Sequence, residues 1–141
     1  MSASIIVDAS AAAKLLFEEE GSGEVEAALS APGVSLLAPD LLVAEVASVI
    51  WKRARRGEIS AGQASELLDR FLMLPVELRP ASDLAAEALQ LAITLDRSVY
   101  DCLDLALAIV SDAVLLTADA RLANALGSTA LAGQIRGVGG G

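Results

Sequence analysis

Short hydrophobic runs alternate with amphipathic segments along the whole chain. Three aliphatic runs, at residues 4–8, 34–38 and 76–79, lack a helical period and predict buried strands. The segments between them have helical spacing and end at glycine, proline or capping residues. The expected helices cover residues 11–18, 23–29, 40–56, 61–73 and a fifth segment that ends near residue 95. Ser10 is expected to cap the first helix and Ser82 the fifth, and Ser60 with Gln63 predicts a capping box for the fourth.

The stretch from Ser98 to Asp119 organises the rest of the chain. It begins with polar residues, continues through an apolar segment that only Asp104 interrupts, and ends with a second apolar run before Asp119. This pattern predicts a buried helix followed by a buried parallel strand. A final helix at residues 120–126 and an edge strand at residues 129–132 are expected to follow.

Alternating strands and helices predict an α/β fold, a three-layer α/β/α sandwich around a mainly parallel central sheet. We expect one domain over residues 1–132 and a flexible glycine-rich tail over residues 133–141. In open α/β sheets, chemistry collects outside the carboxyl ends of the strands. A helix that packs back across the sheet starts near that edge, so Asp101 and Asp119 are expected to meet there.

The composition describes a globular chain outside the membrane. Hydrophobic residues make up 55% of the sequence, and no apolar run reaches the roughly 18 residues that cross a bilayer. The N-terminus lacks the basic start of a signal peptide. The single cysteine, Cys102, excludes an internal disulfide and fits a reducing compartment. We therefore expect a cytoplasmic protein with no membrane contact.

The lack of histidine and the net charge limit the kinds of catalysis and binding that the chain can carry out. The chain has no histidine, which excludes Ser-His-Asp and Cys-His catalysis and the histidine-containing zinc sites. Catalysis is left to carboxylates, hydroxyls, basic side chains or a metal with oxygen ligands. The formal net charge of −9 opposes general binding of nucleic acid. Nucleic acid would have to be held by a local basic patch, a cation or a partner.

Four acids are the candidates for such chemistry. Asp8, Asp101 and Asp119 each follow a strand or begin a helix, so each also fits an ordinary helix cap. Glu45 lies in the aliphatic segment LLVAEVASVI, where a carboxylate is costly to bury unless it is paired or bound to a cation. Four converging carboxylates repel one another unless a hard cation joins them. Oxygen ligands without histidine or cysteine select Mg²⁺ or Mn²⁺.

Four motifs resemble those of the PIN-domain ribonucleases, specifically the VapC toxins of toxin–antitoxin pairs. They are IIVDAS at 5–10, LLVAEVASVIWK at 41–52, SVYDCLDLALA at 98–108 and LLTADARL at 115–122, in the family's order and at its usual spacing. The resemblance implies a PIN-like fold, a Mg²⁺-dependent or Mn²⁺-dependent endoribonuclease, an antitoxin partner and a homodimer. It also implies that Asp8, Glu45, Asp101 and Asp119 form the metal-binding catalytic cluster, supported by Ser10 and Thr117.

Asp104 departs from the family, in which many relatives carry an aromatic or small residue at this position. It follows Asp101 by one helical turn and shares its face. Two interpretations stay open: an additional acid around the metal, or a salt-bridge partner at a dimer contact.

A basic patch near Glu45 favours an RNA substrate. Lys52, Arg53, Arg55 and Arg56 hold four of the ten positive charges. Lys52 and Arg56 return to the face of Glu45, about 10 and 16 Å along the helix axis, where a phosphate backbone could lie. The alternative is a solvated helix end whose cations suit the helix dipole.

Two other enzyme classes fit the sequence less well than a ribonuclease does. A phospho-accepting receiver needs a lysine after a late strand, but the only lysines are Lys14 and Lys52. A haloacid-dehalogenase-like phosphatase needs an aspartate where this chain has Ser10. A non-catalytic interaction protein on the same fold, acting through its partner, is the remaining alternative. The four acids argue against it, and a cleavage assay decides.

Overall fold

The computed structural model describes residues 3–138, which form a five-stranded sheet and the helices that cover it. The strands are β1 (Ala3–Val7), β2 (Val34–Pro39), β3 (Val76–Arg79), β4 (Val114–Thr117) and β5 (Ile135–Gly137). The helices are α1 (Ala9–Leu16), α2 (Ser22–Leu29), α3 (Leu41–Arg55), α4 (Ala61–Leu72), α5 (Ala81–Leu95), α6 (Val99–Val110) and α7 (Ala120–Gly127), with a 3₁₀ turn η1 at Ala132–Gln134.

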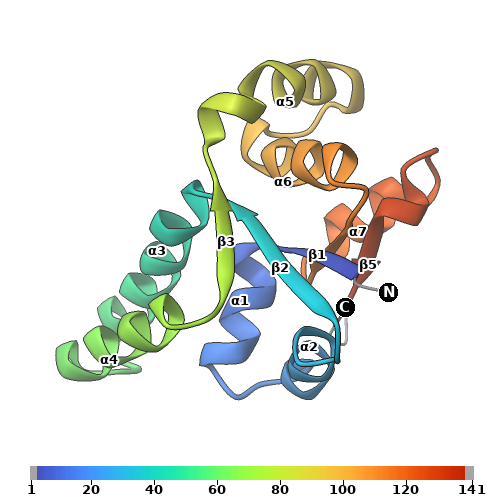
Figure 1. Cartoon of the computed structure of the whole chain (residues 1–141). Helices are drawn as coiled ribbons and strands as arrows, with labels where there is room; N and C mark the ends of the chain where they lie inside the picture. The colour runs from blue at the N-terminus through green and yellow to red at the C-terminus, as the bar shows by residue number, and fades with distance from the viewer. Residues whose placement is uncertain (1–2, 139–141) are drawn as a thin grey trace.

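All neighbouring strands are parallel, in the order β3-β2-β1-β4-β5 (Figure 1). The chain therefore moves outward from β1 through β2 to β3, then crosses back to β4 on the other side of β1. In open α/β sheets a ligand site forms outside the carboxyl ends of the strands at such a reversal. Here that point lies between β1 and β4, directly before Asp8 and Asp119. The predicted α/β/α fold is confirmed.

Strand residues of opposite parity face two separate cores. Ile6, Leu37 and Leu115 pack against α5, α6 and α7 on one face of the sheet. Val7 and Leu116 pack against α1, α2, α3 and α4 on the other. This two-sided burial explains why the strands are hydrophobic runs without alternation. No helix in residues 3–138 is long and apolar enough to span a bilayer.

Two helix caps differ from the prediction. Asp8, not Ser10, caps α1, because its side chain accepts from the Ala11 N–H. Helix α5 begins at Ala81, and Asp40 accepts from the Ala81 N–H at 3.0 Å, so Ser82 is not its cap. Asp40 precedes α3 and is distant from α5 in the sequence, so capping rules based on neighbouring residues do not predict this contact. The capping box of α4 at Ser60 and Gln63 is confirmed.

The predicted edge strand at residues 129–132 is wrong. The last strand lies at Ile135–Gly137, inside the segment assigned to the tail, and pairs with β4. Val138 is buried, and its N–H donates to the Thr117 carbonyl at 2.8 Å. Structured chain thus continues beyond residue 132. The prediction of a flexible tail for residues 139–141 lies outside the described residues.

Candidate active site: an acidic cluster at the carboxyl edge of the sheet

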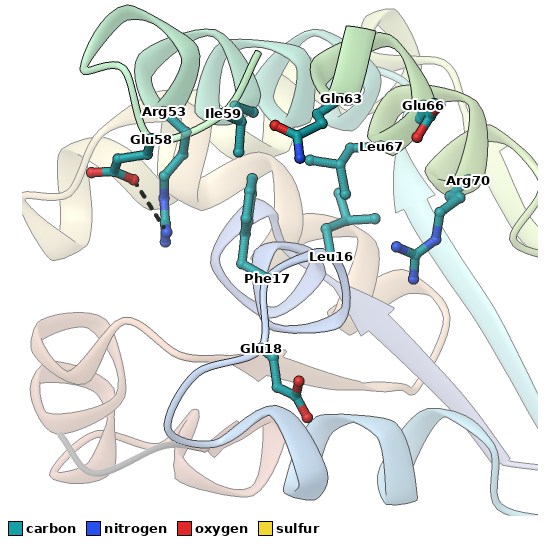
Figure 2. Close-up of a pocket in the computed structure, with 10 residues that line it drawn as sticks. All are labelled: Leu16, Phe17, Glu18, Arg53, Glu58, Ile59, Gln63, Glu66, Leu67 and Arg70. Carbon is teal, nitrogen blue, oxygen red and sulfur yellow. Dashed lines mark ion pairs between the residues drawn. The ribbon is translucent and has the colours of Figure 1, made fainter.

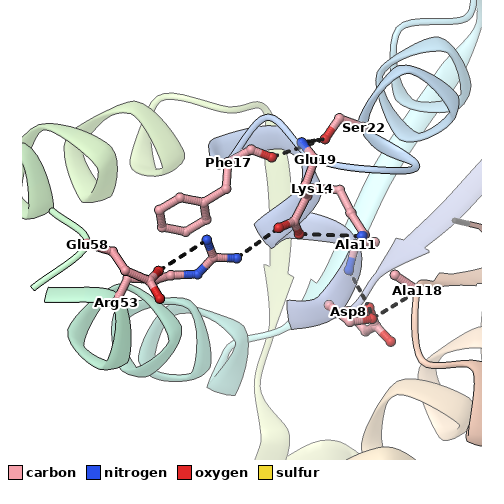
Figure 3. Close-up of polar contacts among 10 residues, drawn as sticks. Asp8, Ala11, Lys14, Phe17, Glu19, Ser22, Arg53, Glu58 and Ala118 are labelled. Atoms are coloured by element: carbon pink, nitrogen blue, oxygen red, sulfur yellow. Dashed lines mark hydrogen bonds and ion pairs between the residues drawn. The ribbon is translucent and has the colours of Figure 1, made fainter. Parts of the chain in front are cut away.

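Asp8 lies at the end of β1 and is 7% exposed. The Ser10 hydroxyl donates to it at 2.6 Å, and the Ala11 N–H donates to the same oxygen at 2.8 Å. Figure 3 shows Asp8 and Ala11 at the start of α1. Burial raises the pKa of the Asp8 carboxyl, the field of Asp119 adds to this, and the hydrogen bonds oppose it. The carboxylate is therefore fixed in place but is costly to ionise.

Ser10 and Thr117 connect β1 to β4 beneath the cluster. Their hydroxyl oxygens lie 3.2 Å apart, and the Ala118 N–H donates to Ser10 at 2.9 Å. The Thr117 hydroxyl oxygen accepts from the Asp119 N–H at 3.0 Å. These hydrogen bonds join Asp8 to the backbone at residues 118–119. The role of Ser10 and Thr117 as supporting residues stays a prediction.

Three further acids reach the same edge from three elements. Glu45 is half-buried in the middle of α3; burial raises its pKa, and the fields of Asp8 and Asp101 add to the shift. Asp101 lies in the first turn of α6, where burial and then Asp119 raise its pKa. Asp119 caps α7 by accepting from two N–H groups at 3.0 and 3.3 Å. The structure therefore brings the four predicted acids into one electrostatic cluster.

Asp104 belongs to this cluster. It is 6% exposed, and burial raises its pKa well above the usual value, with the fields of Asp8, Glu45 and Asp101 adding to the shift. Its place inside the protein beside the other acids favours the interpretation as an additional acid over a salt bridge at a dimer surface. Sequence reasoning missed Arg97, whose field opposes the rise in the pKa of Asp101 that burial and Asp119 cause. Its position directly before the Ser98 cap was the available signal.

The donor set fits a hard divalent cation, although the carboxylates stand apart. In residues 3–138 no three acidic, histidine or cysteine side chains are close enough to form a ready ligand group. Carboxylates that repel one another spread in this way. Mg²⁺ uses only one or two carboxylates and keeps several waters, so it does not require a closed protein cage.

The basic residues of α3 have different surroundings. Arg53 contacts Glu19 at 2.8 Å and Glu58 at 3.5 Å, and its guanidinium lies 4.3 Å from the centroid of the Phe17 ring. Lys14 also pairs with Glu19, at 3.4 Å. We call these five residues the Arg53 network (Figure 3). Arg53 is thus held by the protein itself, although it was predicted to contact RNA.

The other three cations are more exposed. Arg56 pairs with Glu58 at 3.5 Å, and the Arg55 guanidinium lies 5.3 Å from the centroid of the Trp51 ring. Lys52 is exposed and has no ion-pair partner within the described part of the chain. Lys52 and Arg56, on the Glu45 face, therefore remain the stronger candidates for phosphate contacts.

A pocket of about 440 Å³ lies between the end of α1 and the facing sides of α3 and α4 (Figure 2). Leu16, Phe17, Ile59 and Leu67 supply its apolar wall, and Arg53 stands at its side. None of the cluster carboxylates lines it. The pocket is therefore separate from the acidic edge.

The fold, with acids where the strand order reverses, is that of an α/β protein with a site at the carboxyl edge of its sheet. Comparison with known proteins identifies the family. The PIN domain family model matches residues 5–126. Ribonuclease VapC3 of Pyrobaculum aerophilum is 36% identical over 121 residues, which are 84% of this chain and 92% of that protein. The chain therefore belongs to the PIN domain family, as its motifs predicted.

Two solved structures share the fold. VapC20 of Mycobacterium tuberculosis, described as a toxin that cleaves the sarcin-ricin loop, has a TM-score of 0.67 and 18% identity, over 86% of this chain and 94% of that one. A chain of a toxin–antitoxin complex from Klebsiella pneumoniae has a TM-score of 0.61 and 14% identity, over 94% and 95% of the two chains. At these identities the likeness concerns the fold alone.

Proposed function

We propose that this protein is a metal-dependent endoribonuclease that hydrolyses RNA phosphodiester bonds as the toxin of a toxin–antitoxin pair in the cytoplasm. The observation that carries the proposal is the convergence of Asp8, Glu45, Asp101 and Asp119 at the sheet's switch point. Membership of the PIN family and the 36% identity to a VapC ribonuclease support it.

In this proposal Asp8, Glu45, Asp101 and Asp119 hold Mg²⁺ or Mn²⁺. The bound cation supplies a water of lowered pKa and neutralises charge on the phosphate. Ser10 and Thr117 keep Asp8 and the start of α7 in place through the hydrogen bonds described above.

RNA cleavage with and without the cation tests this function. Wild type should cut a labelled RNA at internal positions with Mg²⁺ and lose this activity with a chelator. Glu45→Gln should reduce the cleavage rate on the order of 100-fold. Glu66→Gln, which changes an exposed glutamate of α4, is the matched control and should cleave as wild type does. Cleavage that persists in the chelator, or is equal in all three proteins, contradicts the proposal.

We propose that Lys52 and Arg56 position the RNA backbone. Both are exposed and follow Glu45 along one face of α3. Lys52→Ala with Arg56→Ala should weaken binding of single-stranded RNA and flatten its log–log salt dependence by about 0.7 for each lost contact. The loss should be similar for different RNA sequences, since phosphate contacts do not specify bases. An unchanged salt slope would leave these residues as a solvated helix end.

We propose an antitoxin as the protein partner, and the groove between α3 and α4 as its contact. The apolar residues there include Trp51, which is 54% exposed. The complex from Klebsiella pneumoniae, which shares the fold, supports a partner of this kind. Trp51→Glu should abolish capture by a small antitoxin encoded next to this gene and leave RNA cleavage intact. Unchanged capture would place the contact elsewhere.

We also propose a homodimer. Leu89 and Ile93 lie one turn apart on α5 and are 52% and 75% exposed. Light scattering at micromolar concentration should give a dimer for wild type and a monomer for Ile93→Glu. A monomeric wild type would rule out the homodimer.

A further inference from the structure

Tyr100 exposes its aromatic ring at the start of α6. It is 63% exposed, whereas the helix is buried on all sides from Cys102 to Ala108. Within residues 3–138 its hydroxyl group has no hydrogen-bond partner, and no cation lies over its ring. Trp51, the other exposed aromatic side chain of the described chain, has the Arg55 guanidinium 5.3 Å from its ring centroid. The Tyr100 ring therefore makes no polar or cation–π contact within the protein.

The start of α6 lies at the carboxyl edge of the sheet. The helix ends at Val110, and β4 begins at Val114 after a connection of three residues, so the end of α6 is near the amino edge. Helix α6 has twelve residues and is about 18 Å long. Strand β4 has four residues and is about 13 Å long. Tyr100, in the first turn of α6, is thus carried back to the edge where Asp8 and Asp119 lie.

Helix geometry directs the ring toward the acids. Successive residues of an α-helix are about 100° apart around the axis, so Asp104 lies about 40° from Tyr100 and about 60° from Asp101. Long helical side chains point back toward the N-terminus of their helix. The Tyr100 ring therefore extends beyond the first turn on the side of the two acids. Val99 is about 140° from Asp104 around the axis, so its side chain points away from them.

An exposed aromatic ring at this edge suits a nucleobase. Bases of single-stranded RNA stack on aromatic side chains, and every base can do so because each has a π face. Stacking does not depend on charge, so the net charge of −9, which opposes phosphate binding, does not oppose it. On its face of α6 the ring is next to Asp101 and Asp104. It therefore lacks the surrounding apolar surface that the core of a protein–protein contact has.

We propose that Tyr100 binds RNA by stacking on the base of a nucleotide next to the scissile phosphodiester. The proposal rests on the ribonuclease function above and adds a base contact to the phosphate contacts of Lys52 and Arg56. Because the ring accepts any base, Tyr100 fixes the position of the strand rather than its sequence.

Binding of two oligonucleotides with the same phosphates tests the proposal. One is a uniform adenine RNA of about ten nucleotides, and the other is an abasic strand of equal length and charge. Fluorescence anisotropy gives the dissociation constant of each. Ca²⁺, a hard cation that takes oxygen ligands, is present to reduce the repulsion between the acids and the RNA.

Tyr100→Leu should weaken binding of the adenine RNA on the order of 10-fold and leave binding of the abasic strand unchanged. Tyr100→Phe keeps the ring and should bind both strands as wild type does. Val99→Ala is the matched control, because it shortens an apolar side chain of the same turn that is 38% exposed. It should also bind as wild type does, and the melting temperature of each variant shows that it is folded.

The outcomes separate stacking from other roles of the ring. A loss that is confined to the adenine RNA and absent in Tyr100→Phe supports the proposal. Equal weakening of both strands, unchanged binding in Tyr100→Leu, or no binding of the adenine RNA by wild type overturns it. A Tyr100→Leu protein that binds RNA normally but becomes monomeric in light scattering assigns the ring to a dimer contact and also overturns it. The cleavage assay with a chelator judges the ribonuclease function separately, so stacking can fail while that function stands.

Discussion

The acidic cluster and the Arg53 network both use charges from α3, but they arrange them in opposite ways. In the cluster, Glu45 faces other carboxylates, and the pKa of each shifted acid rises. In the Arg53 network, about two turns further along, Arg53 lies between Glu19 and Glu58 and over Phe17. The network pairs its charges with opposite charges of the protein. The cluster acids are partners in no ion pair of residues 3–138, although Asp8 and Asp119 accept hydrogen bonds.

This contrast distinguishes functional charged side chains from structural ones better than the sign or the number of their charges does. Four cations close in sequence predicted an RNA-binding patch, yet Arg53 pairs with Glu19 in the loop after α1 and with Glu58 in the α3–α4 turn. Four acids far apart in sequence predicted a site, and all four lie at one edge of the sheet, although no three of them form a ready ligand group in residues 3–138. Lack of an oppositely charged partner, more than clustering in sequence, marks the charged side chains that are available to a ligand.

The largest expected effect comes from removing one cluster charge. Asp101→Asn should lower the rate of RNA cleavage on the order of 100-fold or more, because a cation ligand is lost. Ser60→Ala is a suitable control, since it removes a helix cap worth about 1 kcal/mol far from the cluster. The measurement is single-turnover cleavage of a labelled RNA. Equal rates for Asp101→Asn and Ser60→Ala would reduce Asp101 to a structural residue.

Breaking the Arg53 network should cost stability rather than chemistry. Arg53→Ala should lower the free energy of unfolding by about 1–2 kcal/mol, because it loses partly exposed ion pairs and the contact with Phe17. Lys52→Ala, next to it on the same helix, should change stability by less than about 0.5 kcal/mol. Urea denaturation measures both. If Arg53→Ala is as stable as wild type but binds RNA more weakly, Arg53 contacts RNA together with Lys52 and Arg56.

A smaller effect on the free energy of unfolding should come from Glu19 and should depend on pH. Burial alone would raise the pKa of Glu19, but the hydrogen bond from Arg53 and the fields of Lys14 and Arg53 outweigh it and lower the pKa below 4.5. The folded state therefore favours the charged form, so this stabilisation is present above pH 4.5 and is lost as the pH falls through the lowered pKa.

Glu19→Gln should consequently destabilise the protein by less than about 1 kcal/mol at pH 7, and the difference from wild type should vanish in acid. Denaturation series at several pH values check this. A difference that stays constant down to pH 3 would mean that packing, not charge, explains the effect.

The strands and the acids were predictable because each rests on a local pattern. Strands buried on both faces read as hydrophobic runs. Asp8 directly follows β1, and Asp119 lies two residues after the end of β4. What could not be predicted depends on contacts between distant residues. Arg53 meets Glu19 across 34 positions, and Asp40 caps α5 across 41. The strand at Ile135–Gly137 is short, and glycines lie near it in the sequence. Its pairing with β4 therefore explains its strand conformation better than the intrinsic strand propensity of its residues does.

In the proposed metal site, the acids at the sheet edge weaken the protein until a cation binds them. The direct measurement is the melting temperature of wild type and Asp101→Asn, without metal and with saturating Mn²⁺. Without metal, Asp101→Asn should melt at the same temperature as wild type or higher, because one repelling charge is gone. At about 100 times the dissociation constant, Mn²⁺ should stabilise wild type by about 2.7 kcal/mol, and the variant should gain much less. A variant that melts lower without metal and gains as much from Mn²⁺ as wild type would contradict the claim.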